Sequence, residues 1–142
     1  MCRMLGMVSN LDTYLNFTYG ILSEALRKLC EEKKVCHSHG VGFAWLSDSR
    51  WELKKDDKPL WKSTIMRDLV NYTRSKAMIL HARMATYPEY SPQGLKVENT
   101  HPFLAEAMGF RWVFAQNGAI QFNETMVKIR PAEKVLEYKG RT

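Results

Sequence analysis

The second residue, Cys2, is the side chain in this sequence best suited to covalent chemistry. The initiator methionine is removed when the residue after it is small, so Cys2 can become the first residue of the mature protein. An N-terminal cysteine carries a thiol nucleophile and its own α-amine, which can accept the thiol proton as a general base. No separate histidine is then required. Taken alone, Cys2 also fits a small buried side chain at the start of a strand.

A second group of reactive side chains comprises Cys30, Cys36, His37 and His39. Their spacing lacks the paired arrangement of a closed tetrahedral zinc site, so we expect no metal ion here and no cofactor. An odd number of cysteines in a chain without a secretory signal also argues against a disulfide framework.

Several short segments follow one another in a characteristic order. They are Cys2-Arg3-Met4-Leu5-Gly6, Gly40-Val41-Gly42-Phe43-Ala44-Trp45, His81-Ala82-Arg83-Met84-Ala85-Thr86, Asn99-Thr100-His101-Pro102-Phe103 and Phe114-Ala115-Gln116-Asn117-Gly118. This succession resembles the class II glutamine amidotransferases, which are N-terminal-nucleophile hydrolases with a four-layered αββα fold. The chain is most similar to the stand-alone domains of the family, some of which act on γ-glutamyl compounds. The resemblance implies a glutamine or γ-glutamyl amide amidohydrolase that releases ammonia.

The resemblance also assigns a role to each matching residue. Cys2 would form a γ-glutamyl thioester, while Arg83, assisted by Thr86, would hold the α-carboxylate of the substrate. A guanidinium suits this task because its planar fork offers two hydrogen bonds to a carboxylate. Asn117 and Gly118 would form the oxyanion hole through a side-chain amide and a backbone N–H.

Structural readings of the same residues stay open. Arg83 could be a salt-bridged arginine at the end of an apolar strand, and Asn117-Gly118 is a strong type I′ hairpin signal. We interpret His101 as a structural loop histidine, because the amine of Cys2 already supplies a base.

The sequence departs from the family pattern at a few positions. Gln116 stands where relatives usually have histidine, and His39 stands where they usually have aspartate. Tyr87-Pro88 follows Thr86 in place of glycine, which affects the loop shape and the width of the substrate site.

The elements that must position these residues follow from hydrophobic periodicity. We predict an α+β fold with helices packed on an antiparallel sheet. The predicted strands cover residues 4–8, 40–46, 51–54, 77–82 and 111–115, with 120–122 continuing the last of them across a turn at Asn117-Gly118. The predicted helices cover residues 19–33, capped by Thr18, and 59–72, opened by Pro59. Residues 87–103 are too rich in proline for a regular element.

The chain has 142 residues, 45% apolar and 25% charged, which fits one domain spanning residues 1–142. Its net charge of +6 is spread along the sequence, so nucleic-acid binding is disfavoured. No segment approaches the apolar length needed to cross a membrane, and no signal peptide is visible. We expect a cytoplasmic protein.

The alternatives to an amidohydrolase are an inactive module of the same fold that binds a small ligand or partner, and a basic nucleic-acid-binding domain. The expected partners are glutamine or another γ-glutamyl small molecule, and a synthetase subunit or ammonia acceptor. Family members place an aspartate for the substrate's amino group in a segment after the oxyanion loop. We therefore expect the natural protein to continue past Thr142 with such an aspartate, and the present chain to be the N-terminal part of a glutamine amidotransferase type-2 domain.

Overall fold

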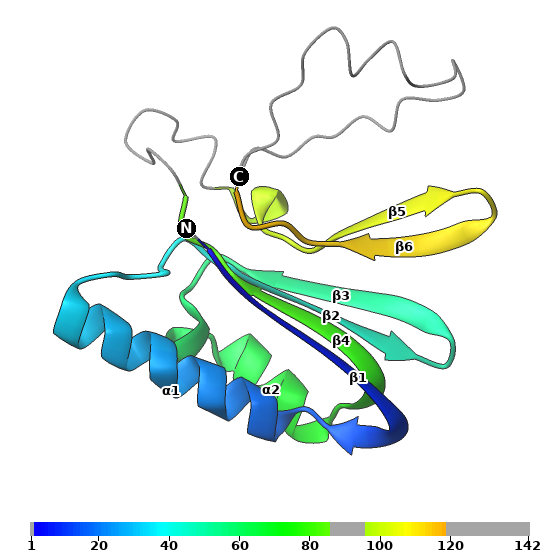
Figure 1. The fold of residues 1–142 in the computed structure, drawn as a ribbon, viewed down its shortest axis with the longest axis horizontal. Coiled ribbons are helices and arrows are strands. Elements are labelled where there is room, and N and C mark those ends of the chain that lie inside the picture. Colours follow the sequence, from blue (N-terminus) through cyan, green and yellow to red (C-terminus); the bar gives the residue numbers. More distant parts are fainter. Residues whose placement is uncertain (1, 86–95, 119–142) are drawn as a thin grey trace, which may run out of the picture.

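The computed structural model describes residues 2–85 and 96–118 (Figure 1). Its elements, in chain order, are β1 (Arg3–Tyr14), α1 (Asn16–Lys33), β2 (Val41–Ser47), β3 (Arg50–Asp56), η1 (Leu60–Lys62), α2 (Thr64–Tyr72), β4 (Arg74–Ala82), η4 (Val97–Asn99), β5 (Phe103–Ala107) and β6 (Phe110–Phe114). Strands β1, β4, β2 and β3 form an antiparallel sheet in that order, and β5 pairs with β6 in a separate hairpin.

Helices α1 and α2 cover one face of the four-stranded sheet, and the β5–β6 hairpin lies over the opposite face (Figure 1). Phe43 and Leu80 from the sheet pack with Leu26, Met66 and Val70 from the helices in one buried core. Side chains alternate between the two faces of a strand, so the residues next to Phe43 and Leu80 point toward the hairpin. Antiparallel sheets with helices on one side confirm the predicted α+β architecture for this part of the chain.

The register of the sheet places the start of β1, the end of β4, the start of β2 and the end of β3 side by side. Arg3 of β1 pairs with Ala82 of β4, and Ala82 in turn pairs with Val41 at the start of β2. Val41 pairs on its other side with Asp56 at the end of β3. Residues that immediately flank these positions therefore meet at one edge of the sheet.

The predicted hairpin of residues 40–46 and 51–54 is confirmed as β2 and β3, and residues 77–82 lie within β4. Strand β1 is longer than predicted and reaches Tyr14, with a register shift between Val8 and Thr13. The predicted strand at residues 111–115 corresponds to β6.

The helix boundaries require two corrections. Helix α1 begins at Asn16 and not after Thr18, whose hydroxyl donates a hydrogen bond to the Leu15 carbonyl within the first turn. Residues 59–72 do not form one helix, because Pro59 keeps an extended conformation and Ser63 ends the short η1 turn before capping α2.

Strand β5 was missed, and it pairs with β6. The connecting turn has positive φ at Met108 and Gly109, and methionine is not a residue that signals such a turn. Residues 120–122 lie outside the described part of the chain.

The absence of a disulfide was also a wrong prediction, because Cys30 and Cys36 are bonded. Helix α1 ends with Lys34 in a left-handed conformation, and its N–H donates a hydrogen bond to the Cys30 carbonyl. This cap reverses the chain and returns Cys36 to the last helical turn.

The segment that enters the hairpin lies directly against the sheet at Gly42. A Cβ atom at this position would overlap the carbonyl oxygen of His101. The His101 ring is buried there, with its centroid 4.9 Å from that of His81 on β4 and 4.7 Å from that of Phe103 on β5. These contacts connect the two layers.

The cap of α2 gives a test of local stability. Ser63 Oγ accepts a hydrogen bond from the Met66 N–H at 3.1 Å and donates one to Asp56 Oδ2 at 2.6 Å, both in buried surroundings. We expect Ser63→Ala to lower the free energy of unfolding by about 1–3 kcal/mol, because it removes the cap and leaves a buried carboxylate oxygen without that donor. The exposed neighbour Thr64→Ala is the control and should change stability much less in urea denaturation. Equal effects would contradict a capping role for Ser63.

The buried histidine pair gives a test of pH dependence. Burial, followed by the nearby cations, lowers the pKa of His81 to about 4 and that of His101 to about 3. An unfolded histidine binds a proton near pH 6.5, so the unfolded state binds more protons as the pH falls below that value. The contribution of the two neutral histidines to the free energy of unfolding should therefore be fully present above about pH 6.5 and should decrease toward about pH 4. Urea unfolding at several pH values should show a smaller decrease in the free energy of unfolding with falling pH in His101→Gln than in the natural protein. Equal slopes in the two proteins would show that the histidine pair does not cause the decrease.

Candidate active site

Cys2 lies at the edge where β1 begins, directly beside the residues that follow β4. This residue is 5% exposed. The Met84 N–H donates to Cys2 Sγ at 3.4 Å, and the thiol lies 3.6 Å from the Met84 carbonyl oxygen, to which it can donate. The pairing of Arg3 with Ala82 produces this contact between residues 82 positions apart.

Arg83 is the first residue after β4 and is 1% exposed. Its backbone N–H donates to the Gly40 carbonyl at 2.9 Å, and its guanidinium Nη1 donates to the Lys96 carbonyl at 3.4 Å. The side chain therefore lies beneath the segment that enters η4. The structure brings Arg83 and Cys2 to the same strand ends, with Met84 between them.

His39 contacts both neighbours of Met84. The His39 N–H donates to the Arg83 carbonyl at 3.2 Å, and His39 Nδ1 accepts from the Ala85 N–H at 2.9 Å. Burial, then the positive charge of Arg83, lowers the pKa of His39. The sequence analysis considered His39 as part of a possible metal site and as a departure from a family pattern, and its contact with the two neighbours of Met84 was not foreseen.

The surroundings of Arg83 are electropositive. Burial, more than the charge of Arg83, lowers the pKa of Lys55 to about 8, against an opposing effect of Glu98. Lys55 Nζ donates to the Glu98 carbonyl at 3.0 Å and lies 4.1 Å from the centroid of the Phe103 ring. Arg83 also contributes to the lowered pKa values of His81 and His101. Such a field disfavours imidazolium ions and favours an anionic ligand.

The remaining predicted residues lie after β6 or outside the described chain. Asn117 and Gly118 are exposed, and Gly118 has φ of 130°, which favours glycine. The preceding residue, Gln116, interacts through its backbone with His81, so this segment approaches the end of β4 (Figure 1). Thr86 belongs to a segment that the structure does not describe.

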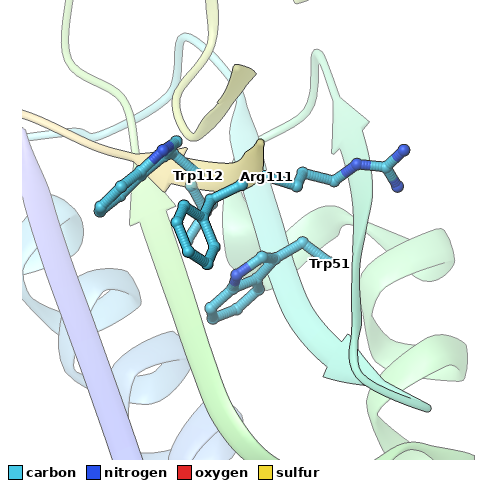
Figure 2. Close-up of a pocket in the computed structure, with 5 residues that line it drawn as sticks. Trp51, Arg111 and Trp112 are labelled. Carbon is cyan, nitrogen blue, oxygen red and sulfur yellow. The ribbon is translucent and has the colours of Figure 1, made fainter. Parts of the chain in front are cut away.

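A shallow groove lies at the other end of the sheet, between β3 and β6. It has a volume of about 300 Å³ and is lined by Trp51, Phe110, Arg111, Trp112 and Val113. Figure 2 shows the rings of Trp51 and Trp112 at this groove and the Arg111 guanidinium extending away from them. The lining carries no nucleophile, so we do not assign the groove to the site around Cys2.

Within residues 2–85 and 96–118, no cluster of three or more histidine, cysteine or acidic side chains is arranged to hold a metal ion. Neither helix in this part of the chain combines the length and apolar character required for a membrane span.

Two named proteins are similar to this chain. A "Putative glutamine amidotransferase" of Haemophilus influenzae is 34% identical over 122 residues, which cover 85% of this chain and 38% of that protein. The "Putative glutamine amidotransferase YafJ" of Escherichia coli is 29% identical over 122 residues, covering 84% of this chain and 44% of that protein. The chain thus spans less than half the length of these relatives. No solved structure matches it.

The sequence profile of the class II glutamine amidotransferases matches residues 1–134, nearly the whole chain. This match extends from Cys2 through Arg83 to the Asn117-Gly118 segment, in agreement with the resemblance of the sequence motifs. The chain belongs to the class II glutamine amidotransferase family.

Proposed function

We propose that this chain carries the glutaminase centre of an amidotransferase, which hydrolyses the side-chain amide of glutamine or a γ-glutamyl compound through Cys2. The observation that carries the proposal is the contact of the Cys2 thiol with Met84, beside the buried Arg83. In this member of the family, the Cys2 thiol and the Arg83 guanidinium, a cation suited to binding a carboxylate, thus lie at the same end of the sheet.

The proposed reaction has two steps. Cys2 Sγ attacks the amide carbon, its proton passes by way of the α-amine to the leaving nitrogen, and ammonia departs as the C–N bond breaks. Water then attacks the γ-glutamyl thioester, the C–S bond breaks, and glutamate leaves with the thiol restored. The Asn117 side-chain amide and the Gly118 N–H would stabilise the oxyanion in both steps, where one such donor typically contributes about 10²–10³ in rate.

Arg83 would hold the α-carboxylate of the glutamyl group, with the Thr86 hydroxyl as an additional donor. The electropositive surroundings of Arg83 support this role, because Lys55 places a second positive charge near it. A planar guanidinium provides the two-point contact that a carboxylate requires.

We further infer that the complete fold is a four-layered αββα sandwich, whose third layer begins with the β5–β6 hairpin. An ammonia acceptor or a synthetase subunit would be a partner of the whole protein and not of this chain alone. We also propose a cytoplasmic location, because the sequence shows no signal peptide.

Cys2 gives the first test. Intact mass of the protein from its native host should show loss of Met1, and Cys2→Ala should abolish ammonia release without changing the circular dichroism spectrum, because no other nucleophile is proposed. An electrophilic glutamine analogue should label Cys2, both in the natural protein and in a Cys30→Ser/Cys36→Ser control. Retention of Met1 on active protein, or labelling of Cys36 in place of Cys2, would refute the mechanism.

Arg83 gives the second test. Arg83→Lys loses the bidentate fork while keeping the charge, so KM for glutamine should rise at least about tenfold with a smaller change in kcat. Arg111→Lys, at an exposed arginine paired with Glu106, is the control and should leave KM unchanged. An unaltered KM in a folded Arg83→Lys variant would assign Arg83 a structural role only.

A further inference from the structure

The loop before β2 is fixed at both of its ends. Cys36 is bonded to Cys30 at the end of α1, and the next residue, His37, is fully buried. At the other end Gly40 has φ of 116°, and a Cβ atom there would lie 2.8 Å from Thr100 Oγ1. The loop therefore presents His39 from a rigid support.

His39 joins this support to the segment that contacts Cys2. Its main chain and its imidazole hydrogen-bond to Arg83 and Ala85, respectively, one residue to each side of Met84. The Met84 N–H in turn donates a hydrogen bond to Cys2 Sγ, and the Met84 carbonyl oxygen lies next to the same sulfur atom. Displacement of Met84 would therefore displace the atoms that surround the thiol.

The bond from the Ala85 N–H specifies the protonation state of the imidazole. Nδ1 is the acceptor, so it carries no proton, and the neutral ring holds its proton on Nε2. A proton added to Nδ1 would face a second donor and break this bond. The groups that act on the ring also disfavour protonation, since burial and the charge of Arg83 both lower its pKa. Among the described residues, Cys2 is a further titratable side chain in contact with this segment.

We propose that His39 is a positioning residue of the thioester chemistry: its neutral imidazole holds residues 83–85 in place against Cys2. The inference rests on the proposed function for its catalytic consequence, but the hydrogen bond itself can be tested without turnover.

Two substitutions distinguish the effect of losing the hydrogen-bond acceptor from the effect of losing the imidazole ring. Asparagine can place an amide oxygen near the position of Nδ1 and still accept from Ala85, whereas glutamine extends toward the position of Nε2. In the full-length protein we expect His39→Asn to keep kcat within a few fold. His39→Gln and His39→Ala should lower kcat by about 10²-fold with less change in KM, because a displacement of about 1 Å at the nucleophile is that costly. Ser38→Ala in the same loop is the control and should behave as the natural protein.

The pH profile provides a readout that a general loss of packing would not alter. Protonation of His39 should add a reversible loss of kcat at a pH below the ordinary histidine value of about 6.5, because burial and the charge of Arg83 lower the pKa of His39. His39→Asn should lack this component, since its amide does not titrate, while the losses caused by protonation of the Cys2 α-amine and of the buried pair His81 and His101 remain. Equal kcat in His39→Asn and His39→Gln, or an acid limb of the same shape in the natural protein and His39→Asn, would overturn the proposal.

Hydrogen exchange of the Ala85 amide distinguishes failure of this inference from failure of the proposed function. The amide should exchange slowly in the natural protein and His39→Asn, and faster in His39→Gln. Iodoacetamide modification of Cys2 should change in rate only in His39→Gln and His39→Ala. If the natural protein does not hydrolyse glutamine but these patterns hold, the proposed function fails and the positioning contact stands. If exchange at Ala85 is the same in all variants, the positioning contact is wrong even in an active enzyme.

Discussion

The antiparallel pairing of β1 with β4 determines the relation between Cys2 and Arg83. Both strands belong to one sheet, and Leu80 and Met78 lie on its buried face. A shift of the β1–β4 register by one residue would turn the apolar side chains of the shifted strand to the opposite face. The hydrophobic core thus fixes the register, and the register fixes which residue lies beside the thiol. The position of the Cys2 thiol at the end of the sheet depends in this way on burial at its centre.

The electrostatic character of the site follows from the same compact arrangement. Arg83 is buried, Lys55 is half-buried, and His81 and His101 lie close enough to experience their charge. Because the histidines stay neutral, they contribute packing without adding further positive charge. The positive field is then concentrated on the arginine and lysine, which suits the recognition of a carboxylate.

Much of the fold could be predicted because the strands near the site carry strong local signals. The β2–β3 hairpin has a glycine-opened apolar run followed by an alternating strand, and the motifs around Cys2 and Arg83 identified the family. The turn at Met108-Gly109 has no comparable signal, so no strand was predicted at the position of β5.

The contacts that tertiary structure creates were the hardest to foresee. The Cys30–Cys36 bond depends on the left-handed Lys34 cap, and the part played by Ser63 depends on Asp56 reaching it from another element. His39 contacts Ala85 across 46 positions of sequence, a pairing that local periodicity does not encode. The predicted roles of Thr86, Asn117 and Gly118 rest on the family resemblance.

The close approach at Gly42 has a consequence for how this protein can vary. Backbone there meets backbone, since the His101 carbonyl occupies the space of a missing Cβ atom. As long as residue 42 is glycine, the distance between the sheet and the segment that enters the hairpin is therefore limited at this point by main-chain atoms. Residues of the hairpin could be exchanged during evolution to suit another substrate or partner while the spacing between the two layers stayed the same.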